Sequence, residues 1–465
     1  MQQFIHQAWH NDTLQALKEF IKLPCKSKDF DPKWEQNKLL LAALEQAQKW
    51  GEKALSNASF EVVQLPGLPP VLFFDIPATG KYQNQTILFY GHFDKQPETQ
   101  GWMEGLGPWQ PKVKDHRLYG RGSVDDGYNF YSVITAIQAL EHTNVSHPRI
   151  CGLFETDEES GSTDLGLYLD NLKERIGQPI YIGILDLFAN DFNRVWLTQS
   201  LRGVISLVVK VSVLKESVHS GLASGIVPSP FRILRTLLDR IEDAQTGHLR
   251  LPSLFSKIPD YCVKPLKDFS NEHDVRGDFN FLNNVQASES SSYDALVAGT
   301  WHPTMSVLGI DGLPATETAS ALIHDSTAVK LSFRIPPGVD SQKALQDIYE
   351  TLTSNPPYNA KVEISQMNAH NGFNAPPLPT WLSTKASEFS NSIFEHPLGW
   401  VFCGASIGTL PLFQQAFPNT VFLNTGALGP NNNAHAPNEW LDLVYVEKLT
   451  LWLAKLIAST PDKES

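Results

Sequence analysis

The sequence predicts an α/β protein whose first domain has a mixed central sheet flanked by helices and is interrupted by an inserted α+β domain. Three observations indicate this fold class. Apolar, β-favouring runs alternate with helical periodicity over residues 1–202, a different pattern occupies residues 203–375, and the first pattern returns after a Pro-rich stretch at 374–379. Strands that alternate with helices are typical of a sheet covered by helices. At 465 residues, more than one core is expected.

Periodicity justifies each element of the first domain in turn. Apolar residues at helical spacing predict helices at 13–23, 33–50 and 127–141. Apolar runs rich in β-favouring residues predict strands at 71–76, 86–90, 150–156 and 179–185. After the Pro-rich linker, the pattern continues with a helix at 380–394, a strand at 420–424 and a helix at 439–458. The first domain therefore comprises residues 1–202 and 376–465.

The inserted domain spans residues 203–375. A long apolar run predicts a strand at 204–213, and the following apolar stripe predicts a helix at 228–244. A strand at 328–335, a helix at 341–353 and a strand at 360–364 complete a compact α+β unit. Because both flanking segments share one pattern, the simplest interpretation is one domain inserted into another.

Bulk properties exclude several classes of protein. The formal net charge of −13 argues against a nucleic-acid partner, which would require a basic stripe. No apolar run approaches the roughly 18 residues of a membrane span, and the N-terminus lacks the pattern of a signal peptide. The four cysteines are widely spaced and form no CxxC pair, which indicates a reducing compartment. We expect a cytoplasmic protein without a membrane partner.

Residues capable of metal chemistry follow the predicted strands. His92 comes after the run at 86–90, Glu158 and Glu159 after the run at 150–154, and Asp186 after the run at 179–185. In open α/β sheets, ligands bind at the carboxyl ends of strands. Asp125 also precedes a predicted helix. The pattern therefore predicts a carboxylate-rich metal site at one edge of the sheet.

Each residue alone has a simpler explanation. Acidic residues are common in the first turn of a helix, Asp186 suits a turn, and His435 lies in an Asn-rich loop. Taken together, the candidates supply two histidines and three carboxylates, a ligand set suited to zinc, manganese or cobalt. These residues are His92, Asp125, Glu159, Asp186 and His435. Such a set can hold two ions when one carboxylate bridges them.

Two further acids have expected supporting roles. Asp94, two residues after His92, could accept the second imidazole N–H and fix the histidine tautomer. Glu158 adjoins the candidate ligand Glu159 and is left free to move a proton. The two neighbouring glutamates are thus expected to perform different tasks.

Motifs along nearly the whole chain resemble the M20 metallopeptidase family, whose members include dipeptidases, carboxypeptidase G-like enzymes and succinyl-diaminopimelate desuccinylase. In chain order, these are Tyr90-Gly-His92-Phe-Asp94, Leu118-Tyr-Gly-Arg-Gly-Ser-Val-Asp125-Asp126-Gly, Glu155-Thr-Asp-Glu158-Glu159-Ser-Gly161, Asp186, Ser217-Val-His219-Ser-Gly221, Phe333-Arg334-Ile-Pro336 and His435. The resemblance implies a metallopeptidase or amidohydrolase that cleaves amide bonds in small substrates, either dipeptides or N-acyl amino acids.

The resemblance also implies a role for each site residue. One metal ion would be held by His92, Asp125 and Asp186. The other would be held by Asp125, Glu159 and His435, so that Asp125 bridges the ions. Two divalent cations are implied, with zinc preferred and manganese or cobalt as alternatives. Hydroxide between them would be the nucleophile and Glu158 the general base.

The inserted segment resembles the family's lid and dimerisation domain, which implies a homodimer. His219 would stabilise the oxyanion, in its own subunit or in the partner's site. Arg334 resembles the arginine that binds a terminal carboxylate, and Ser406 is expected to bind the substrate. These residues complete the site that the resemblance implies.

One departure from the family pattern concerns substrate choice. Where dipeptidases carry an acid near the substrate's free amine, this chain has Cys403, which favours an N-acylated substrate. Two alternatives stay open. The run Gly404-Ala-Ser406-Ile-Gly408 fits a serine-hydrolase motif, although no acid lies between Ser406 and His435. A catalytically silent binding protein on the same fold is the other.

Overall fold

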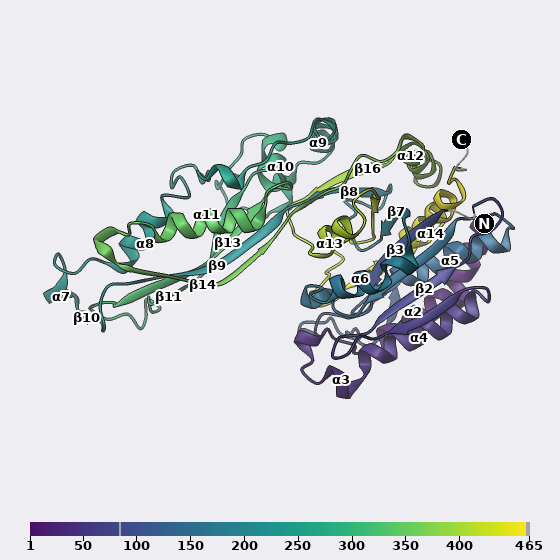
Figure 1. Cartoon of the computed structure of the whole chain (residues 1–465), viewed down its shortest axis with the longest axis horizontal. Coiled ribbons are helices and arrows are strands. Elements are labelled where there is room, and N and C mark those ends of the chain that lie inside the picture. Colours follow the sequence, from purple (N-terminus) through teal and green to yellow (C-terminus); the bar gives the residue numbers. More distant parts are fainter. Residues whose placement is uncertain (83–84, 462–465) are drawn as a thin grey trace. The chain divides into compact units, whose positions relative to one another are not determined.

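The computed structural model describes residues 1–82 and 85–461. The chain folds into two compact units (Figure 1). Unit 1 comprises Met1–Thr198, Ala375–Val401 and Thr409–Ser465, and unit 2 comprises Gln199–Asn374 and Phe402–Gly408. The segment Phe402–Gly408 was expected in the first domain. It belongs to unit 2 because Arg202 donates hydrogen bonds to the carbonyl oxygens of Cys403 and Gly404. Unit 2 thus interrupts unit 1 along the chain.

A mixed six-stranded sheet organises unit 1. Its strands, in spatial order, are β1 (Ser59–Val63), β2 (Val71–Ile76), β6 (Arg149–Glu155), β3 (Thr86–His92), β7 (Pro179–Ile184) and β17 (Val421–Asn424). The last four run parallel, whereas β1 and β2 pair antiparallel. The parallel strands therefore end at one shared edge, where His92 and the residues after β6 and β7 are located.

Helices cover both faces of this sheet. Successive side chains of β3 point to opposite faces. Gly91 faces Asn129 of α5 (Tyr128–His142), while the ring of Tyr90 contacts Phe413 of α13 (Thr409–Ala416) at a centroid distance of 4.8 Å. On the α5 side, further packing comes from α1 (Gln2–Ala8), α4 (Leu39–Ala54) and α14 (Leu443–Ala458), while α6 (Leu165–Ile176) packs against α13.

Most predicted elements of unit 1 occur within a few residues of their expected bounds, including α2 (Leu14–Ile21) and α12 (Thr380–Phe394). Two differ. The helix expected at 33–50 is broken into α3 (Trp34–Asn37) and α4 at Lys38, whose φ is 55°. The final helix begins at Leu443 because the preceding residues form β18 (Trp440–Asp442) and Asp442 caps the helix.

Unit 2 is built on the antiparallel sheet β11-β13-β9-β14. Its strands are β11 (Thr304–Asp311), β13 (Ser326–Ile335), β9 (Gly203–Ser212) and β14 (Lys361–His370). Alternate side chains of β9 and β13 are buried under α8 (Pro230–Leu238) and α11 (Ser341–Thr353). One face of the sheet is therefore core, as the period-two burial pattern requires.

Several elements of unit 2 were not predicted. They include α9 (Asp260–Glu272), α10 (Ser292–Thr300) and the edge strand β11. The helix expected at 228–244 also ends at Leu238. β11 gave no alternation signal because most of its side chains are exposed and a bulge interrupts its pairing between Val307 and Gly309.

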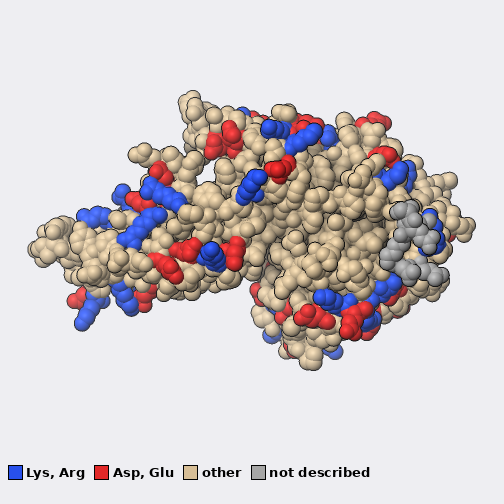
Figure 2. Space-filling model, turned by 45° about the horizontal axis from the view of Figure 1, so that its top comes forward, with Lys and Arg blue, Asp and Glu red and all other residues tan. Residues whose placement is uncertain are grey.

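The surface and the thiols complete the description. On the face drawn in Figure 2, basic and acidic side chains are interspersed. Within residues 1–82 and 85–461, no helix combines the length and apolar character needed to span a bilayer. All four cysteines are free thiols, and Cys25, Cys151 and Cys262 are buried.

Candidate metal centre

His92 is buried at the carboxyl end of β3 and faces two carboxylates. Its Nε2 atom lies 3.2 Å from Oδ1 of Asp125 and 3.5 Å from Oδ2 of Asp186. Asp125 belongs to the helical turn η3 (Ser123–Gly127), in which the Asp125–Asp126 peptide bond is cis. Asp186 follows β7 and forms a bridge with Gly426. These three side chains form the first candidate ligand group.

A second candidate group shares Asp125. Nε2 of His435 lies 2.9 Å from Oδ2 of Asp125 and 3.2 Å from Oε2 of Glu159. Glu159 is in the 3₁₀ turn η4 (Glu158–Ser160) after β6. His435 has a φ of 63° in a loop where Asn433 is also left-handed, a conformation that asparagine tolerates well. Asp125 therefore presents one oxygen to each group.

The donor atoms fit hard or borderline divalent cations. In each group, one donor atom per residue lies within 4.8 Å of the others. Oδ1 of Asp186 and Oε1 of Glu159 are buried and have no hydrogen-bond partner among the described residues. A buried carboxylate oxygen without a partner is costly unless a cation or donor satisfies it. Carboxylate and imidazole donors suit zinc, manganese or cobalt.

The carboxylates around the two histidines favour positive charge on the imidazole rings. Burial acts to lower the pKa of His92, but Asp125 and Asp186 raise it well above its ordinary value. Hydrogen bonds to Asp125 and Glu159 raise the pKa of His435 to about 11. Burial acts to raise the pKa of Asp125, yet hydrogen bonds from both histidines hold it below its usual range. The centre is thus a concentration of negative charge paired with imidazoles.

The other carboxylates are crowded. Burial, then the charge of Asp125, raises the pKa of Glu159 to about 7, and burial raises the pKa of Asp186 to about 6. Burial, opposed by His92 and reinforced by Asp186 and Glu159, raises the pKa of Glu158 well above its usual value. Carboxylates crowded in a poorly solvated site mark a functional centre.

Asp94 orients the turn that carries the two glutamates. Its carboxylate accepts hydrogen bonds from the backbone N–H of Glu158 at 3.2 Å and of Glu159 at 2.9 Å. The sequence suggested a contact between Asp94 and the His92 imidazole. Nδ1 of His92 lies 3.0 Å from the Asp94 backbone oxygen and 3.4 Å from its Oδ1. Asp94 thus links the candidate ligand His92 to the turn at Glu158.

Within the described residues, none donates a hydrogen bond to the Glu158 carboxylate. Glu159, in contrast, accepts hydrogen bonds from Gln96 at 2.6 Å and from His435. Sequence reasoning missed Gln96, which lies four residues after His92 in no recognisable pattern. The two neighbouring glutamates therefore have different surroundings.

Glu439 is a second residue that sequence reasoning missed. This buried carboxylate accepts hydrogen bonds from Arg121 at 2.7 Å and from the backbone N–H groups of Val124 and Asp125 at 3.2 and 3.4 Å. Arg121 also donates to the carbonyl oxygen of Ala436. The pair therefore connects the turn of Asp125 with the loop of His435. The signal available was Arg121, which lies inside the Gly-Arg-Gly part of a recognised motif.

The remaining predicted residues belong to unit 2. Nη1 of Arg334 donates to Oγ of Ser406 at 2.7 Å, so these two side chains are brought together. His219 lies on β10 (Val218–His219) and is exposed. Ser217, two residues before His219, donates to Asp325, which directly precedes β13, whereas Arg334 lies near the end of that strand. Unit 2 therefore keeps His219 and Arg334 well apart.

Comparison with known proteins identifies the chain. Residues 88–459 match the family model described as peptidase family M20/M25/M40. The chain belongs to this family. It is a peptidase of the metal-dependent M20 family, and the predicted family and fold class are confirmed.

Individual relatives are distant but cover almost the whole length. The chain is 24% identical to the Beta-Ala-His dipeptidase of Homo sapiens, over 97% of this chain and 90% of that protein. It is 23% identical to the cysteinylglycine-S-conjugate dipeptidase of Corynebacterium striatum, over 89% of each. An M20 family metallo-carboxypeptidase from Sulfolobus solfataricus has a TM-score of 0.77 at 17% identity, over 96% of this chain and 99% of that one. This last likeness concerns the fold.

Proposed function

We propose that this M20 peptidase hydrolyses the amide bond of small substrates that carry a free carboxylate, namely dipeptides or N-acyl amino acids. The observation that carries the proposal is the position of Asp125, whose two oxygens face His92 on one side and His435 on the other. Two divalent cations, zinc first and manganese or cobalt as alternatives, fit the two groups of donors. When bound, such cations acidify water and polarise an amide carbonyl.

Glu158 is the proposed general base. It lies beside the candidate ligand Glu159, and among the described residues no donor is committed to its carboxylate. Glu158 takes a proton from the attacking water and returns it to the departing amine nitrogen. Asp94 holds the backbone of Glu158 and thereby the direction of its carboxylate. Asp94 is accordingly a positioning residue.

Arg334 and Ser406 are proposed to receive the substrate carboxylate. Arg202 provides a second guanidinium group near Arg334. Burial, and then the charge of Arg334, lower the pKa of Arg202 to about 10. Within residues 1–82 and 85–461, the guanidinium of Arg202 donates only to neutral groups, namely the carbonyl oxygens of Gly404 and His302 and the hydroxyl of Thr304. Two cationic side chains without a carboxylate partner among the described residues suit an anionic substrate group.

His219 is proposed to stabilise the oxyanion in the partner subunit's site of a homodimer. The eight residue steps from Ser326 to Arg334 span about 27 Å along β13 at the usual rise per residue. If both Arg334 and His219 contact one small substrate, they must therefore come from different copies of unit 2. This separation supports a dimer with shared sites.

A serine nucleophile at Ser406 is disfavoured. The strand β16 (Gly399–Cys403) and the helix α13 do flank its loop, as a nucleophile elbow requires. The hydroxyl of Ser406, however, accepts a hydrogen bond from Arg334, which cannot act as a base. Nε2 of His435 faces Asp125 and Glu159 instead.

A substrate panel with controlled metal content tests the proposal. The protein is stripped with a chelator, reloaded with zinc, manganese or cobalt, and assayed on dipeptides and on N-acyl amino acids. We expect hydrolysis of at least one class, lost on stripping and restored by reloading, without inhibition by a serine-directed phosphonate. Hydrolysis that persists in the stripped protein, or no hydrolysis by any reloaded form, contradicts the proposal.

A further inference from the structure

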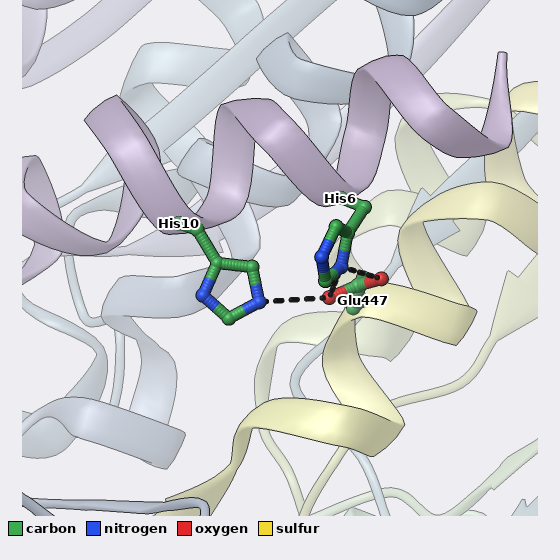
Figure 3. A group of neighbouring side chains, drawn as sticks. All are labelled: His6, His10 and Glu447. Carbon is green, nitrogen blue, oxygen red and sulfur yellow. Dashed lines mark hydrogen bonds and ion pairs between the residues drawn. The ribbon is translucent and has the colours of Figure 1, made fainter.

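A further group of side chains that could hold a metal ion lies on the surface of unit 1 and shares no residue with the candidate metal centre. Figure 3 shows His6 and His10 projecting from the N-terminal helix toward Glu447 on α14. Nδ1 of His6 lies 2.9 and 3.1 Å from the two carboxylate oxygens of Glu447, and Nε2 of His10 lies 3.7 Å from Oε2. One donor atom from each residue lies within 4.8 Å of the others.

From these contacts we infer that His6, His10 and Glu447 form a surface site for a divalent transition-metal ion such as Zn²⁺. Four-residue spacing places both histidines on one face, although the chain passes from α1 into the π-helical turn η1 (Trp9–Thr13) between them. Two imidazoles and one carboxylate are a ligand set that zinc accepts, with water in the remaining position.

The distances require only small adjustments. Ligand atoms about 2.0–2.1 Å from a tetrahedral zinc ion lie about 3.4 Å from one another. The observed separations from Oε2 of Glu447, 3.1 Å to Nδ1 of His6 and 3.7 Å to Nε2 of His10, bracket that value. The side chains of His6 and His10 are 58% and 57% exposed, so their rings can rotate without disturbing the core.

The backbone that presents these donors is held firmly. Ile5 and Trp9, which precede the two histidines, are buried, and Trp9 donates to the hydroxyl of Thr450 at 3.0 Å. Thr450 lies one helical turn after Glu447 and is itself buried. These contacts hold the N-terminal helix in place against α14. An ion therefore binds to a largely preformed site. Binding would clamp the first helix of the chain to its last.

The test measures the zinc content of protein whose proposed catalytic centre has been loaded with zinc and which is then equilibrated with micromolar free Zn²⁺. Wild type is compared with His6→Ala/His10→Ala and with Glu447→Gln. The matched control is His116→Asn/His248→Asn, which removes two other exposed histidines, 59% and 73% exposed. The measurements are zinc per chain by elemental analysis and the zinc-induced shift in melting temperature.

We expect each cluster variant to bind one zinc ion fewer per chain than wild type and the control. We also expect zinc to raise the melting temperature of wild type and the control by more than that of the cluster variants. Peptidase activity should be equal in all four proteins. Equal zinc content in wild type and His6→Ala/His10→Ala overturns the inference, whatever the metal content of the proposed catalytic centre.

Discussion

Glu158 and Glu159 are neighbours in one short turn, yet hydrogen bonds distinguish them. Glu159 accepts hydrogen bonds from Gln96 and His435 on its carboxylate, whereas Glu158 is held through its backbone, and within the described residues no donor contacts its carboxylate. A group that moves a proton needs a carboxylate free of fixed donors, while a ligand needs an oriented one. The sequence could indicate that the two acids divide their tasks. The donors that separate them, Gln96 and the Asp94 carboxylate, become visible only in three dimensions.

Gln96 provides a prediction at this scale. We expect Gln96→Ala to weaken metal binding by roughly 10- to 100-fold, because Glu159 loses the donor that orients it. The measurement is competition with a chelator of known affinity. Gln15→Ala serves as control, since Gln15 makes a similar 2.7 Å hydrogen bond to exposed Glu19. Equal metal affinity in Gln96→Ala and wild type would show that Gln96 has no such role.

At the scale of the elements, the turn η3 depends on the ion pair between Arg121 and Glu439, which lie 318 positions apart in the sequence. Strand ends could be located from apolar runs, and so could His92 and Asp186. Arg121 and Glu439 could not be paired, because a buried ion pair between distant loops leaves no periodicity in the sequence. The same limit applies to β11, whose exposed side chains carry no alternation.

We expect Glu439→Gln to lower the free energy of unfolding by about 3 kcal/mol, because it leaves the buried guanidinium of Arg121 unpaired. The matched control is Glu61→Gln, which breaks an ion pair of the same 2.7 Å length between Glu61 and Arg175 on the surface. That change should cost less than about 1 kcal/mol. Urea unfolding measures both. Equal losses in the two variants would refute the role given to the buried pair.

The sheet also contains a carboxyl group that responds to pH. Burial raises the pKa of Glu155 from 4.5 to about 8, and Tyr90 and Ser162 donate hydrogen bonds to it. Between these pH values the folded state keeps a proton that the unfolded state loses, so this group's contribution to stability falls as pH rises. Glutamine does not titrate, so the stability of the Glu155→Gln variant does not fall with pH for this reason.

We therefore expect the stability of Glu155→Gln relative to wild type to increase between pH 5 and pH 8, by on the order of 3 kcal/mol. Urea unfolding of both proteins across this range measures the difference. Because other carboxylates titrate equally in both proteins, their effects cancel. A difference in stability that does not change with pH would contradict the assignment.

For the whole molecule, the order of strands and helices along the chain was enough to predict an interrupted α/β fold. Assembly is a different matter, because a single sequence contains no record of which side chains meet across a subunit boundary. The separation of His219 from Arg334 along unit 2 is a structural observation that supports shared sites.

Mixing two inactive variants tests shared sites. We expect Glu158→Gln and His219→Ala, unfolded and refolded together, to regain about one quarter of wild-type activity, since half of the dimers are mixed and each has one intact site. Each variant refolded alone is the control. No recovery in the mixture would place His219 in its own subunit's site or outside the reaction.

The division of labour between Glu158 and Glu159 is tested most directly by measuring metal content and turnover in the same samples. We expect Glu158→Gln to keep the wild-type metal content and to lose roughly 100- to 10,000-fold in kcat. Glu159→Gln should lose metal along with activity, because it removes a candidate ligand. A Glu158→Gln enzyme that retains full turnover, or that loses metal as Glu159→Gln does, would contradict the account.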